Sequence, residues 1–264
     1  MQTYDLYDKI ECRVEPARKK VRLDAYTVGK SAPSVLILPG GAYNMISDSN
    51  EGKPIAEALQ ERGYNAFVLW YRVGAAARYP APMLDVARAM QFLQSRADEF
   101  GVEENRIALL GSSAGGHLAA YFGAQYKLFA RKYEGKAYPL RPAALVLSYP
   151  VITMGKLTHA LSRRRLLGLF SGKKEQAAAS VEQLVSAEYP PTFLWHNKDD
   201  ASVDYRNSQM LADALEQYGV AHELHLYPTG GHGIGLAKGK DAEEWFEQAF
   251  SFLQRSMGKR NATA

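Results

Sequence analysis

The sequence predicts an α/β fold in which helices cover both faces of a mostly parallel central sheet. Short apolar runs, typical of buried strands, alternate along the chain with longer amphipathic stretches, typical of helices. Such alternation produces crossover connections, which place helices on both sides of a parallel sheet. A length of 264 residues and a hydrophobic content of 47% suffice for one large core. We therefore expect a single domain over residues 1–264.

The first elements form one edge of that sheet. Thr3–Tyr7 and Val21–Val28 have no expected helix between them, so we predict antiparallel edge strands. Val35–Leu38 is an aliphatic, β-branched run that ends at Pro39-Gly40-Gly41, which predicts a strand followed by a loop. Pro54–Arg62 has apolar residues on one face and a glycine after its end, which predicts a helix.

The middle of the chain supplies the central strands. Ala66–Tyr71 and Ile107–Leu110 are short apolar runs that predict buried strands. Between them, Pro80–Phe100 carries apolar residues at helical spacing and predicts one long helix. Ser113–Tyr126 predicts a helix directly after the second strand, and Ala143–Ser148 predicts the next strand.

The last third of the chain continues the alternation after one interruption. Residues 152–188 contain no expected strand, so this segment is either a cap over a pocket or a solvated helical connection. Strands are expected at Thr192–His196 and Glu223–Tyr227, with a helix over Tyr205–Tyr218 between them. Asp241–Met257 predicts a closing helix. It has more aromatic residues than one helix face needs, which indicates either a wide buried face or an interface. The oligomeric state does not follow from the sequence.

Composition excludes several classes of partner and site. The net charge of +4 is mild, with 32 Lys+Arg against 28 Asp+Glu, which does not favour nucleic acid. No apolar run is long enough for a membrane span, and the polar residues 1–10 do not resemble a signal peptide. A single cysteine, Cys12, excludes an intrachain disulfide and multi-cysteine metal sites. We expect a cytoplasmic protein.

The strongest chemical signal is a G-x-S-x-G motif. It spans Gly111–Gly115, directly after one predicted strand and at the start of a predicted helix, which is the context the motif requires. A sharp strand-to-helix turn exposes Ser113 as a nucleophile, and the flanking glycines keep neighbouring backbone from colliding with it. On its own, the motif is also compatible with a Gly/Ser-rich turn that has no chemistry.

Partners for Ser113 occur in the chain order that this motif requires, which is serine, then acid, then histidine. His232 lies in a glycine-rich loop after the strand 223–227. The other histidines are less suited: His117 is adjacent to the motif, His159 lies in the segment 152–188, and the rest lie at or within strands. The acid is expected on the loop after the strand 192–196, where both Asp199 and Asp200 can accept the Nδ1 proton of His232. Both candidates remain open at this point.

An oxyanion hole completes the predicted site. Gly40-Gly41-Ala42 follows the strand Val35–Leu38, where enzymes with this motif place a backbone donor. The N–H of Ala114, just after the nucleophile, is the second donor, and Gly41 or Ala42 supplies the first. Such a site needs no metal or organic cofactor.

These residues resemble the serine esterases of the α/β-hydrolase superfamily, in particular the acetyl-esterase or xylan-esterase-like group related to the hormone-sensitive-lipase and prolyl-oligopeptidase branches. The matching segments spread over most of the chain. They are Leu38–Tyr43, Ser47-Asp48, Glu51-Gly52, Val68–Val73, Gly111–His117, Ser148–Ile152, Pro191–His196 and Gly230–Gly233.

The resemblance implies a mechanism and a substrate class. In that group the acid belongs to an Asp-x-x-Val pattern, which selects Asp200 with Val203. The implied reaction is hydrolysis of short-chain esters, most plausibly acetyl esters of sugars, through an acyl-enzyme. Tyr43 and Tyr149 are implied as pocket walls, with core packing as the competing interpretation. Lipases of the superfamily carry His-Gly-Gly-Gly where this chain has Pro39 and Ala42 at the outer positions, so lipase specificity does not transfer.

Three other functions use the same motif order. A prolyl-oligopeptidase-type peptidase usually carries an additional propeller domain, for which 264 residues leave no room. An amide or thioester hydrolase would use the same three residues. A non-catalytic ligand-binding member of the fold usually lacks the serine or the histidine, whereas both are present here.

Overall fold

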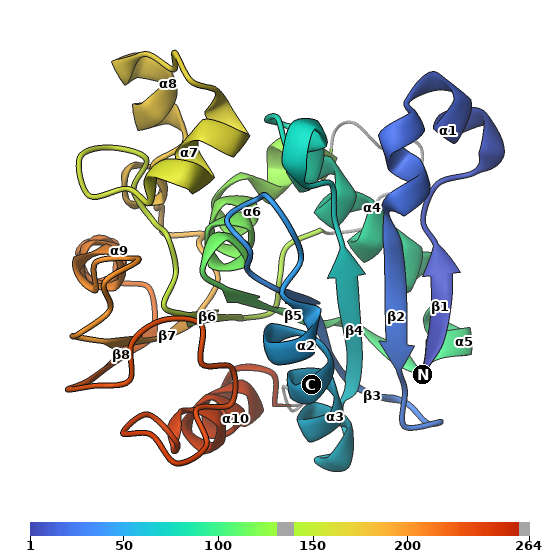
Figure 1. Cartoon of the computed structure of the whole chain (residues 1–264). Helices are drawn as coiled ribbons and strands as arrows, with labels where there is room; N and C mark the ends of the chain where they lie inside the picture. The colour runs from blue at the N-terminus through green and yellow to red at the C-terminus, as the bar shows by residue number, and fades with distance from the viewer. Residues whose placement is uncertain (131–139, 259–264) are drawn as a thin grey trace.

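The computed structural model describes residues 1–130 and 140–258, which are built around one eight-stranded sheet (Figure 1). The strand order is β1-β2-β4-β3-β5-β6-β7-β8. The pairs β1–β2 and β2–β4 are antiparallel, and every other neighbouring pair is parallel. The strands are β1 (Gln2–Asp5), β2 (Arg22–Tyr26), β3 (Ala32–Leu38), β4 (Asn65–Trp70), β5 (Val102–Ser112), β6 (Leu145–Ser148), β7 (Thr192–Asn197) and β8 (His222–Tyr227).

Helices connect the strands and cover both faces, as predicted. The α-helices are α1 (Lys9–Val14), α2 (Asp48–Glu51), α3 (Lys53–Glu61), α4 (Ala81–Ser95), α5 (Ala97–Phe100), α6 (Ala114–Ala130), α7 (Ala160–Leu167), α8 (Lys173–Ala178), α9 (Arg206–Gln217) and α10 (Trp245–Ser256). Three short 3₁₀ helices are η1 (Pro16–Lys20), η2 (Gly74–Ala76) and η4 (Val181–Gln183). No helix within these described ranges is long and apolar enough to cross a membrane.

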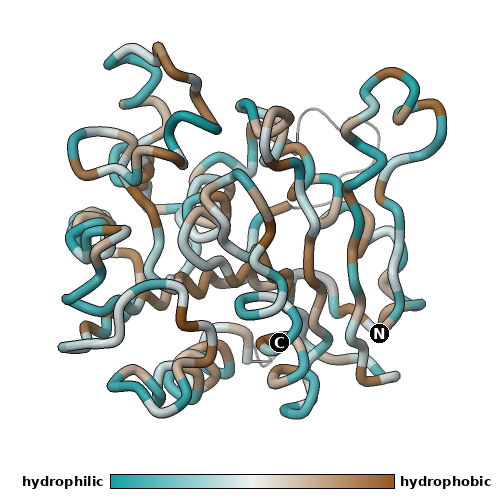
Figure 2. The backbone as a smooth tube through the Cα atoms, viewed as in Figure 1, coloured by the Kyte–Doolittle hydropathy of each residue, from teal (hydrophilic) through white to brown (hydrophobic). Residues whose placement is uncertain are grey.

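The central strands β3, β4, β6 and β7 bury both of their faces. Along β3, Val35 and Ile37 belong to a cluster that includes residues of α3 and α10, whereas Leu36 and Leu38 belong to a cluster with α4 and α6. Figure 1 accordingly shows α3 and α10 on one side of the sheet and α4 and α6 on the other. In Figure 2, hydrophobic stretches run along the strands between these two layers. Two cores on one sheet explain why the central strands read as near-continuous apolar runs.

Several predicted boundaries are wrong. The connection between the first two strands is not helix-free, because α1 and η1 lie there and α1 begins with an Asp8/Glu11 capping box. The expected helix Pro80–Phe100 is interrupted at Arg96, and its second part ends at Gly101 in the left-handed conformation. The two N-terminal strands are antiparallel at one end of the sheet, as predicted, with β1 as the edge strand and β2 paired to both β1 and β4.

The closing helix α10 begins at Trp245 rather than Asp241, because the preceding residues form turns. Its aromatic residues are accounted for by packing within the chain. Trp245, Phe246 and Phe252 are buried in the cluster on that side of the sheet, and the ring of Phe250 lies 5.3 Å from that of Tyr64. A wide buried face therefore explains the composition of this helix.

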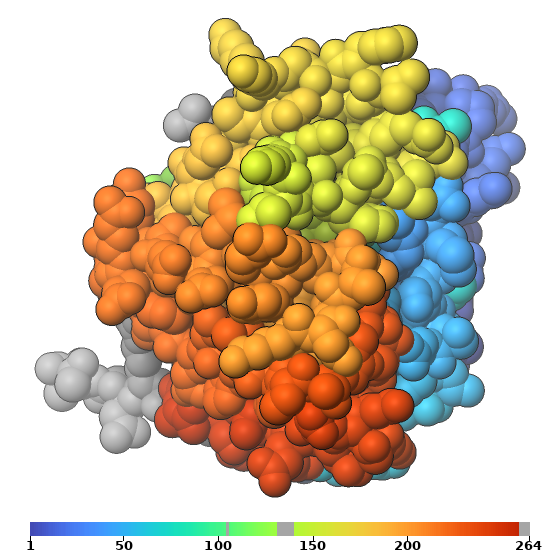
Figure 3. Space-filling model, turned by 60° about the vertical axis from the view of Figure 1, so that its left-hand side comes forward, coloured from blue at the N-terminus to red at the C-terminus, as the bar shows by residue number. Residues whose placement is uncertain are grey.

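The segment 152–188 contains no strand, as predicted, and instead holds α7, α8 and η4. Figure 3 shows this segment in yellow across the upper part of one face of the molecule, next to the blue N-terminal segment. Asn207 of α9 binds the start of the segment. Its Oδ1 accepts hydrogen bonds from the backbone N–H groups of Ile152 and Thr153 at 2.9 and 3.1 Å. The segment is therefore packed onto the core at its start.

Candidate active site

Ser113 occupies a strained turn between β5 and α6. Its φ of 55° lies in the left-handed region, which non-glycine residues rarely adopt. The turn is held on both sides, since the Ser113 N–H donates to the carbonyl of Ser148 at 2.9 Å and the Ser113 carbonyl accepts from Val151 at 3.1 Å. These bonds tie the serine to the end of β6. Strain imposed by surrounding structure is typical of functional turns.

The glycines of the motif are required by close backbone contacts. A Cβ on Gly115 would lie 1.9 Å from the carbonyl oxygen of Leu38, and a Cβ on Gly111 would lie 2.3 Å from that of Gly115. The third glycine, Gly116, packs against Pro150, whose Cβ would lie 2.7 Å from an added Cβ. The start of α6 can therefore lie against the end of β3 only without a side chain at Gly115, and against Pro150 only without one at Gly116.

Ser113, His232 and Asp200 form one line of hydrogen bonds. The Nε2 atom of His232 lies 2.8 Å from Ser113 Oγ, and its Nδ1 atom lies 2.6 Å from Asp200 Oδ2. An ionised carboxylate can only accept hydrogen bonds, so the Nδ1 atom of His232 carries the proton and donates a hydrogen bond to Asp200. The Nε2 atom is then unprotonated and can accept the serine proton. Ser113 is 6% exposed and the His232 side chain 20% exposed, so both are accessible to a small molecule. The structure thus brings together the three residues that the sequence predicted.

Asp199 and Asp200, left open by the sequence, have different surroundings. Asp200 reaches His232, and its other oxygen accepts the N–H groups of Ser202 and Val203 at 2.8 and 2.9 Å. Asp199 instead accepts the N–H groups of Gly230 and Gly231 at 3.1 and 2.9 Å, so it holds the loop on which the histidine lies.

The charge of Asp200 is stabilised by several donors. Burial by itself raises the pKa of this carboxyl, but hydrogen bonds from His196 and His232 outweigh it and hold the pKa well below its usual range. His196 is fully buried, with Nε2 at 3.1 Å from Asp200 Oδ2 and 2.9 Å from the carbonyl of Val203. His196 ends the predicted strand Thr192–His196, and its ring contacts the acid directly.

The loop after β3 has the geometry of an anion-binding turn. Gly41, Ala42 and Tyr43 all have positive φ values, of 121°, 58° and 56°. Within the described part of the chain, the N–H groups of Gly41 and Ala42 donate no hydrogen bond. Ala114 is the first residue of α6, where an N–H has no partner in its own helix. Successive free donors of this kind favour negative charge.

Tyr43 and Tyr149 do not contact the pocket in the way that the resemblance implied. Both side chains are fully buried. The Tyr43 hydroxyl bonds to Nδ1 of His117 at 2.8 Å. The Tyr149 ring packs edge-on against the His232 ring at 4.8 Å. Their hydroxyls need buried partners, so both tyrosines support the site from beneath instead of lining it.

Glu51 is a buried acid beneath the same site, and sequence reasoning gave it no role. Its Oε2 accepts the N–H of Gly40 at 2.9 Å, and its Oε1 accepts the hydroxyl of Tyr149 at 2.8 Å. Burial raises the pKa of Glu51, and the two hydrogen bonds partly offset that effect. The residue lies on the four-residue helix α2, which has too few residues to show a periodic pattern.

A hollow of about 370 Å³ opens above Ser113 and His232. Its walls come from the loop after β3, through Asn44 and Met45, and from the segment 152–188, through His159 and Leu161. Burial lowers the pKa of His159, and the charge of nearby His232 adds to that effect. The hollow therefore lies between the predicted oxyanion loop and the predicted cap.

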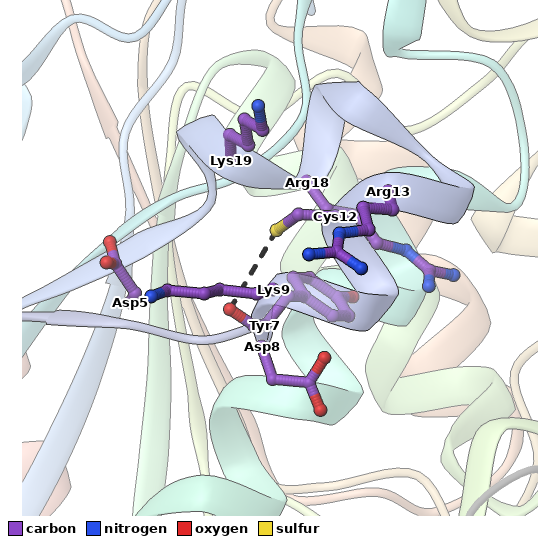
Figure 4. Close-up of a pocket in the computed structure, with 8 residues that line it drawn as sticks. All are labelled: Asp5, Tyr7, Asp8, Lys9, Cys12, Arg13, Arg18 and Lys19. Carbon is purple, nitrogen blue, oxygen red and sulfur yellow. Dashed lines mark hydrogen bonds between the residues drawn. The ribbon is translucent and has the colours of Figure 1, made fainter.

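A larger hollow, of about 450 Å³, lies beside α1 and η1. Figure 4 shows that its lining is mostly charged and includes Lys9, Arg13 and Asp8 around Cys12. The thiol of Cys12 is directed to the carbonyl of Tyr7 at 3.9 Å. None of the predicted catalytic residues lines it. In the described ranges, no group of three or more His, Cys, Asp or Glu side chains could hold a metal ion.

Comparisons with known proteins identify the family of the chain. The sequence profile of the BD-FAE family matches residues 23–215. The chain is 32% identical to endo-1,4-beta-xylanase B of Butyrivibrio fibrisolvens over 83% of its length, and 28% identical to an acetylxylan esterase of Xylanibacter ruminicola over 85%. It spans less than half of either relative, 35% and 44% respectively.

Solved structures give a similar result over whole chains. An acetyl ester-xyloside bifunctional hydrolase from Caldicellulosiruptor lactoaceticus is 33% identical, with a TM-score of 0.87 and 96% coverage of both chains. A carboxylesterase from Lactobacillus plantarum is 28% identical, with a TM-score of 0.77 and coverage of 89% of this chain and 92% of that one.

Proposed function

The chain belongs to the BD-FAE family and has the α/β-hydrolase fold, and on that premise we propose that it is a serine esterase with Ser113 as its nucleophile. One observation carries the proposal. A single line of hydrogen bonds runs from Ser113 Oγ through both nitrogens of His232 to Asp200, at 2.8 and 2.6 Å. That arrangement activates a hydroxyl for attack on a carbonyl.

The proposed reaction transfers the acyl group in two steps. His232 Nε2 accepts the Ser113 proton while Oγ attacks the ester carbonyl, and Asp200 stabilises the imidazolium. The N–H groups of Ala114 and of Gly41 or Ala42 bind the oxyanion. His232 then gives its proton to the leaving alcohol, and an acyl-enzyme remains. Water, deprotonated by His232, attacks the acyl-enzyme, and Ser113 recovers its proton as the acid leaves.

We propose that the acyl group is short, with acetyl as the principal case, and that the alcohol is a sugar. The names of two relatives support this, since one acts on acetylxylan and one on acetyl esters and xylosides. The hollow above Ser113 is small, at about 370 Å³. His159 and Leu161 close one side of it, so we also propose that residues 152–188 form its cap within a single domain.

Hydrolysis of p-nitrophenyl acetate by variants tests the assignment. Ser113→Ala should lose essentially all turnover, and Asp200→Asn should lose roughly 10³- to 10⁴-fold in kcat because the histidine tautomer is no longer fixed. Asp199→Asn is the matched control, since Asp199 contacts only the loop backbone, and its loss should be far smaller. Equal losses for the two aspartates, or full turnover by Ser113→Ala, would contradict the assignment.

A series of acetyl, butyryl and octanoyl p-nitrophenyl esters tests the acyl group. The proposal predicts that kcat/KM falls with chain length. A preference for octanoate would contradict it.

A further inference from the structure

Three arginine side chains line a further hollow between η2 and α7. This hollow measures about 430 Å³, and Arg78, Arg164 and Arg165 contribute to its wall together with Gly74, Ala75 and Leu169. No acidic residue lines it. Its lining therefore carries three positive charges, supplied by two segments that are far apart in the sequence.

The hollow continues the wall of the active-site pocket. Leu161, Arg164 and Arg165 are three and four residues apart on α7, so they share one face of that helix. Leu161 lines the pocket over Ser113, and the arginines lie one helical turn farther along, a rise of about 5 Å. The two hollows are also connected on the side opposite α7. There the N–H of Gly74, which lines the arginine hollow, donates to the carbonyl of Tyr43 at 2.8 Å, and Tyr43 belongs to the loop that lines the active-site pocket.

The guanidinium groups in this hollow have no anionic partner. Within residues 1–130 and 140–258, none of the three forms an ion pair or a side-chain hydrogen bond, and the buried Nε of Arg165 has no acceptor. The adjacent Arg163 differs, since its Nη1 donates to the carbonyls of Met154 and Gly155 at 3.1 and 3.0 Å. A buried guanidinium N–H without an acceptor in the protein is free to donate to an oxygen of a bound anion.

Groups of the protein neutralise only part of the positive charge of these three arginines. The guanidinium of Arg78 lies against the end of α7, where a Cβ on Gly168 would be 2.1 Å from Nη1. The carbonyl end of a helix offsets about half of one positive charge, which leaves more than two charges without compensation. A guanidinium matches carboxylate and phosphate oxygens through paired hydrogen bonds, so the hollow has the chemistry of an anion site.

We propose that Arg164 and Arg165, with Arg78, bind an anionic group of the substrate, a carboxylate or a phosphate, on the part that extends past Leu161 from the scissile ester. This inference rests on the proposed esterase function and specifies its substrate class. The enzyme would then select acetylated compounds that also carry an acidic substituent, and neutral esters of the same shape would be poorer substrates.

Three matched acetate esters test the proposal. They are 4-acetoxybenzoate, 4-acetoxyphenyl phosphate and neutral 4-acetoxybenzamide. For each enzyme, kcat/KM of an anionic ester is divided by kcat/KM of the amide, so that differences between enzyme preparations cancel. Arg164→Gln/Arg165→Gln should lower this ratio by about tenfold relative to the unmodified chain. The arm with the larger loss identifies the carboxylate or the phosphate as the preferred anion.

Lys173→Gln/Lys174→Gln is the charge-matched control, because both lysines are exposed on the neighbouring helix α8 and line none of these hollows. It should leave the ratio at the level of the unmodified chain. An unchanged ratio in the arginine variant, or an equal loss in the lysine control, would overturn the proposal.

Calorimetry separates this outcome from a failure of the proposed function. Ser113→Ala should bind 4-hydroxybenzoate or 4-hydroxyphenyl phosphate about tenfold more tightly than the same protein with Arg164→Gln/Arg165→Gln. That result supports the anion site even if no ester is hydrolysed. Equal binding of both anions by the two proteins would overturn it.

Discussion

The hydroxyl of Tyr149 donates a buried hydrogen bond of 2.8 Å to the carboxylate of Glu51. Through this pair, two loops of the site are joined. Glu51 accepts the N–H of Gly40 in the predicted oxyanion loop, and the Tyr149 hydroxyl accepts the N–H of Gly235, beyond His232, at 3.2 Å. The positions of the predicted oxyanion loop and of the histidine are therefore coupled beneath Ser113.

Tyr149→Phe tests this coupling. The variant leaves Glu51 and the Gly235 N–H each short of one buried partner, which should cost about 1–3 kcal/mol of unfolding free energy. It should also lower kcat more than it raises KM, because the lost hydroxyl joins the loop of His232, through Gly235, to Glu51 and the loop of Gly40. Urea denaturation and steady-state kinetics measure both effects.

Tyr189→Phe is the control for that variant. Tyr189 is also buried with one hydrogen bond, to the carbonyl of Ala120 at 3.0 Å, but it lies outside the site. It should lose stability without losing kcat. If the two variants lowered kcat equally, Tyr149 would have no special link to the catalytic residues.

His196 should act as a positioning residue for the acid. His196→Asn removes the contact between Nε2 and Asp200, so the carboxylate loses one stabilising donor, and kcat should fall about tenfold with little change in KM. Ser208→Ala removes the partner of His196 Nδ1 at 2.8 Å and leaves the contact with Asp200, so its effect should be smaller. A larger effect from Ser208→Ala on kcat would contradict this role.

Gly115→Ala should prevent the normal packing of α6 against β3. The added Cβ would be 1.9 Å from the carbonyl oxygen of Leu38, a backbone atom that cannot move alone. We expect a loss of at least about 3 kcal/mol in unfolding free energy, visible in thermal melts. Gly172→Ala is the control, since its φ is −78° and its new Cβ would meet only the end of the Glu175 side chain, at 3.3 Å. Similar melting temperatures for both variants would contradict the packing argument.

The buried His117 makes stability depend on pH. Burial lowers its pKa to about 4, although the hydrogen bond to the Ala179 carbonyl works in the opposite direction. The unfolded chain therefore binds a proton below about pH 6.5 that the native state takes up only near pH 4, so the stabilisation is complete above pH 6.5 and declines as the pH falls.

Urea denaturation of the unmodified chain and of His117→Asn, which lacks this titration, measures the effect. The stability advantage of the unmodified chain should shrink by about 2 kcal/mol between pH 7 and pH 5. An advantage that stays constant over this range would contradict a neutral buried histidine.

The sequence predicted the parallel core, and it singled out Ser113 and His232, because each depends on local signals. Apolar runs mark the central strands, and the motif around Ser113 lies between a strand and a helix. The resemblance to serine esterases of the α/β-hydrolase superfamily is confirmed by the family match and the structural neighbours. The short helices α1 and α2 were missed, since four to six residues carry too few apolar positions to show a period.

Contacts between distant segments were beyond sequence reasoning. Asp199 and Asp200 are adjacent in sequence, and the resemblance alone selected Asp200; the folded loops show that its carboxylate faces the histidine. The buried carboxylate of Glu51 is compatible with an exposed helix position until Gly40 and Tyr149 are placed beside it. The arginine hollow likewise depends on η2 and α7 lying next to each other.

Covalent trapping of Ser113 tests the central claim most directly. The protein is incubated with a p-nitrophenyl phosphonate ester, and its mass and peptide map are recorded. We expect one phosphonyl group per chain, located on Ser113, and its absence from Ser113→Ala. His232→Gln should label far more slowly, because Oγ then has no base. A phosphonyl group on another residue, or equal labelling of Ser113→Ala, would contradict the assignment of Ser113 as the nucleophile.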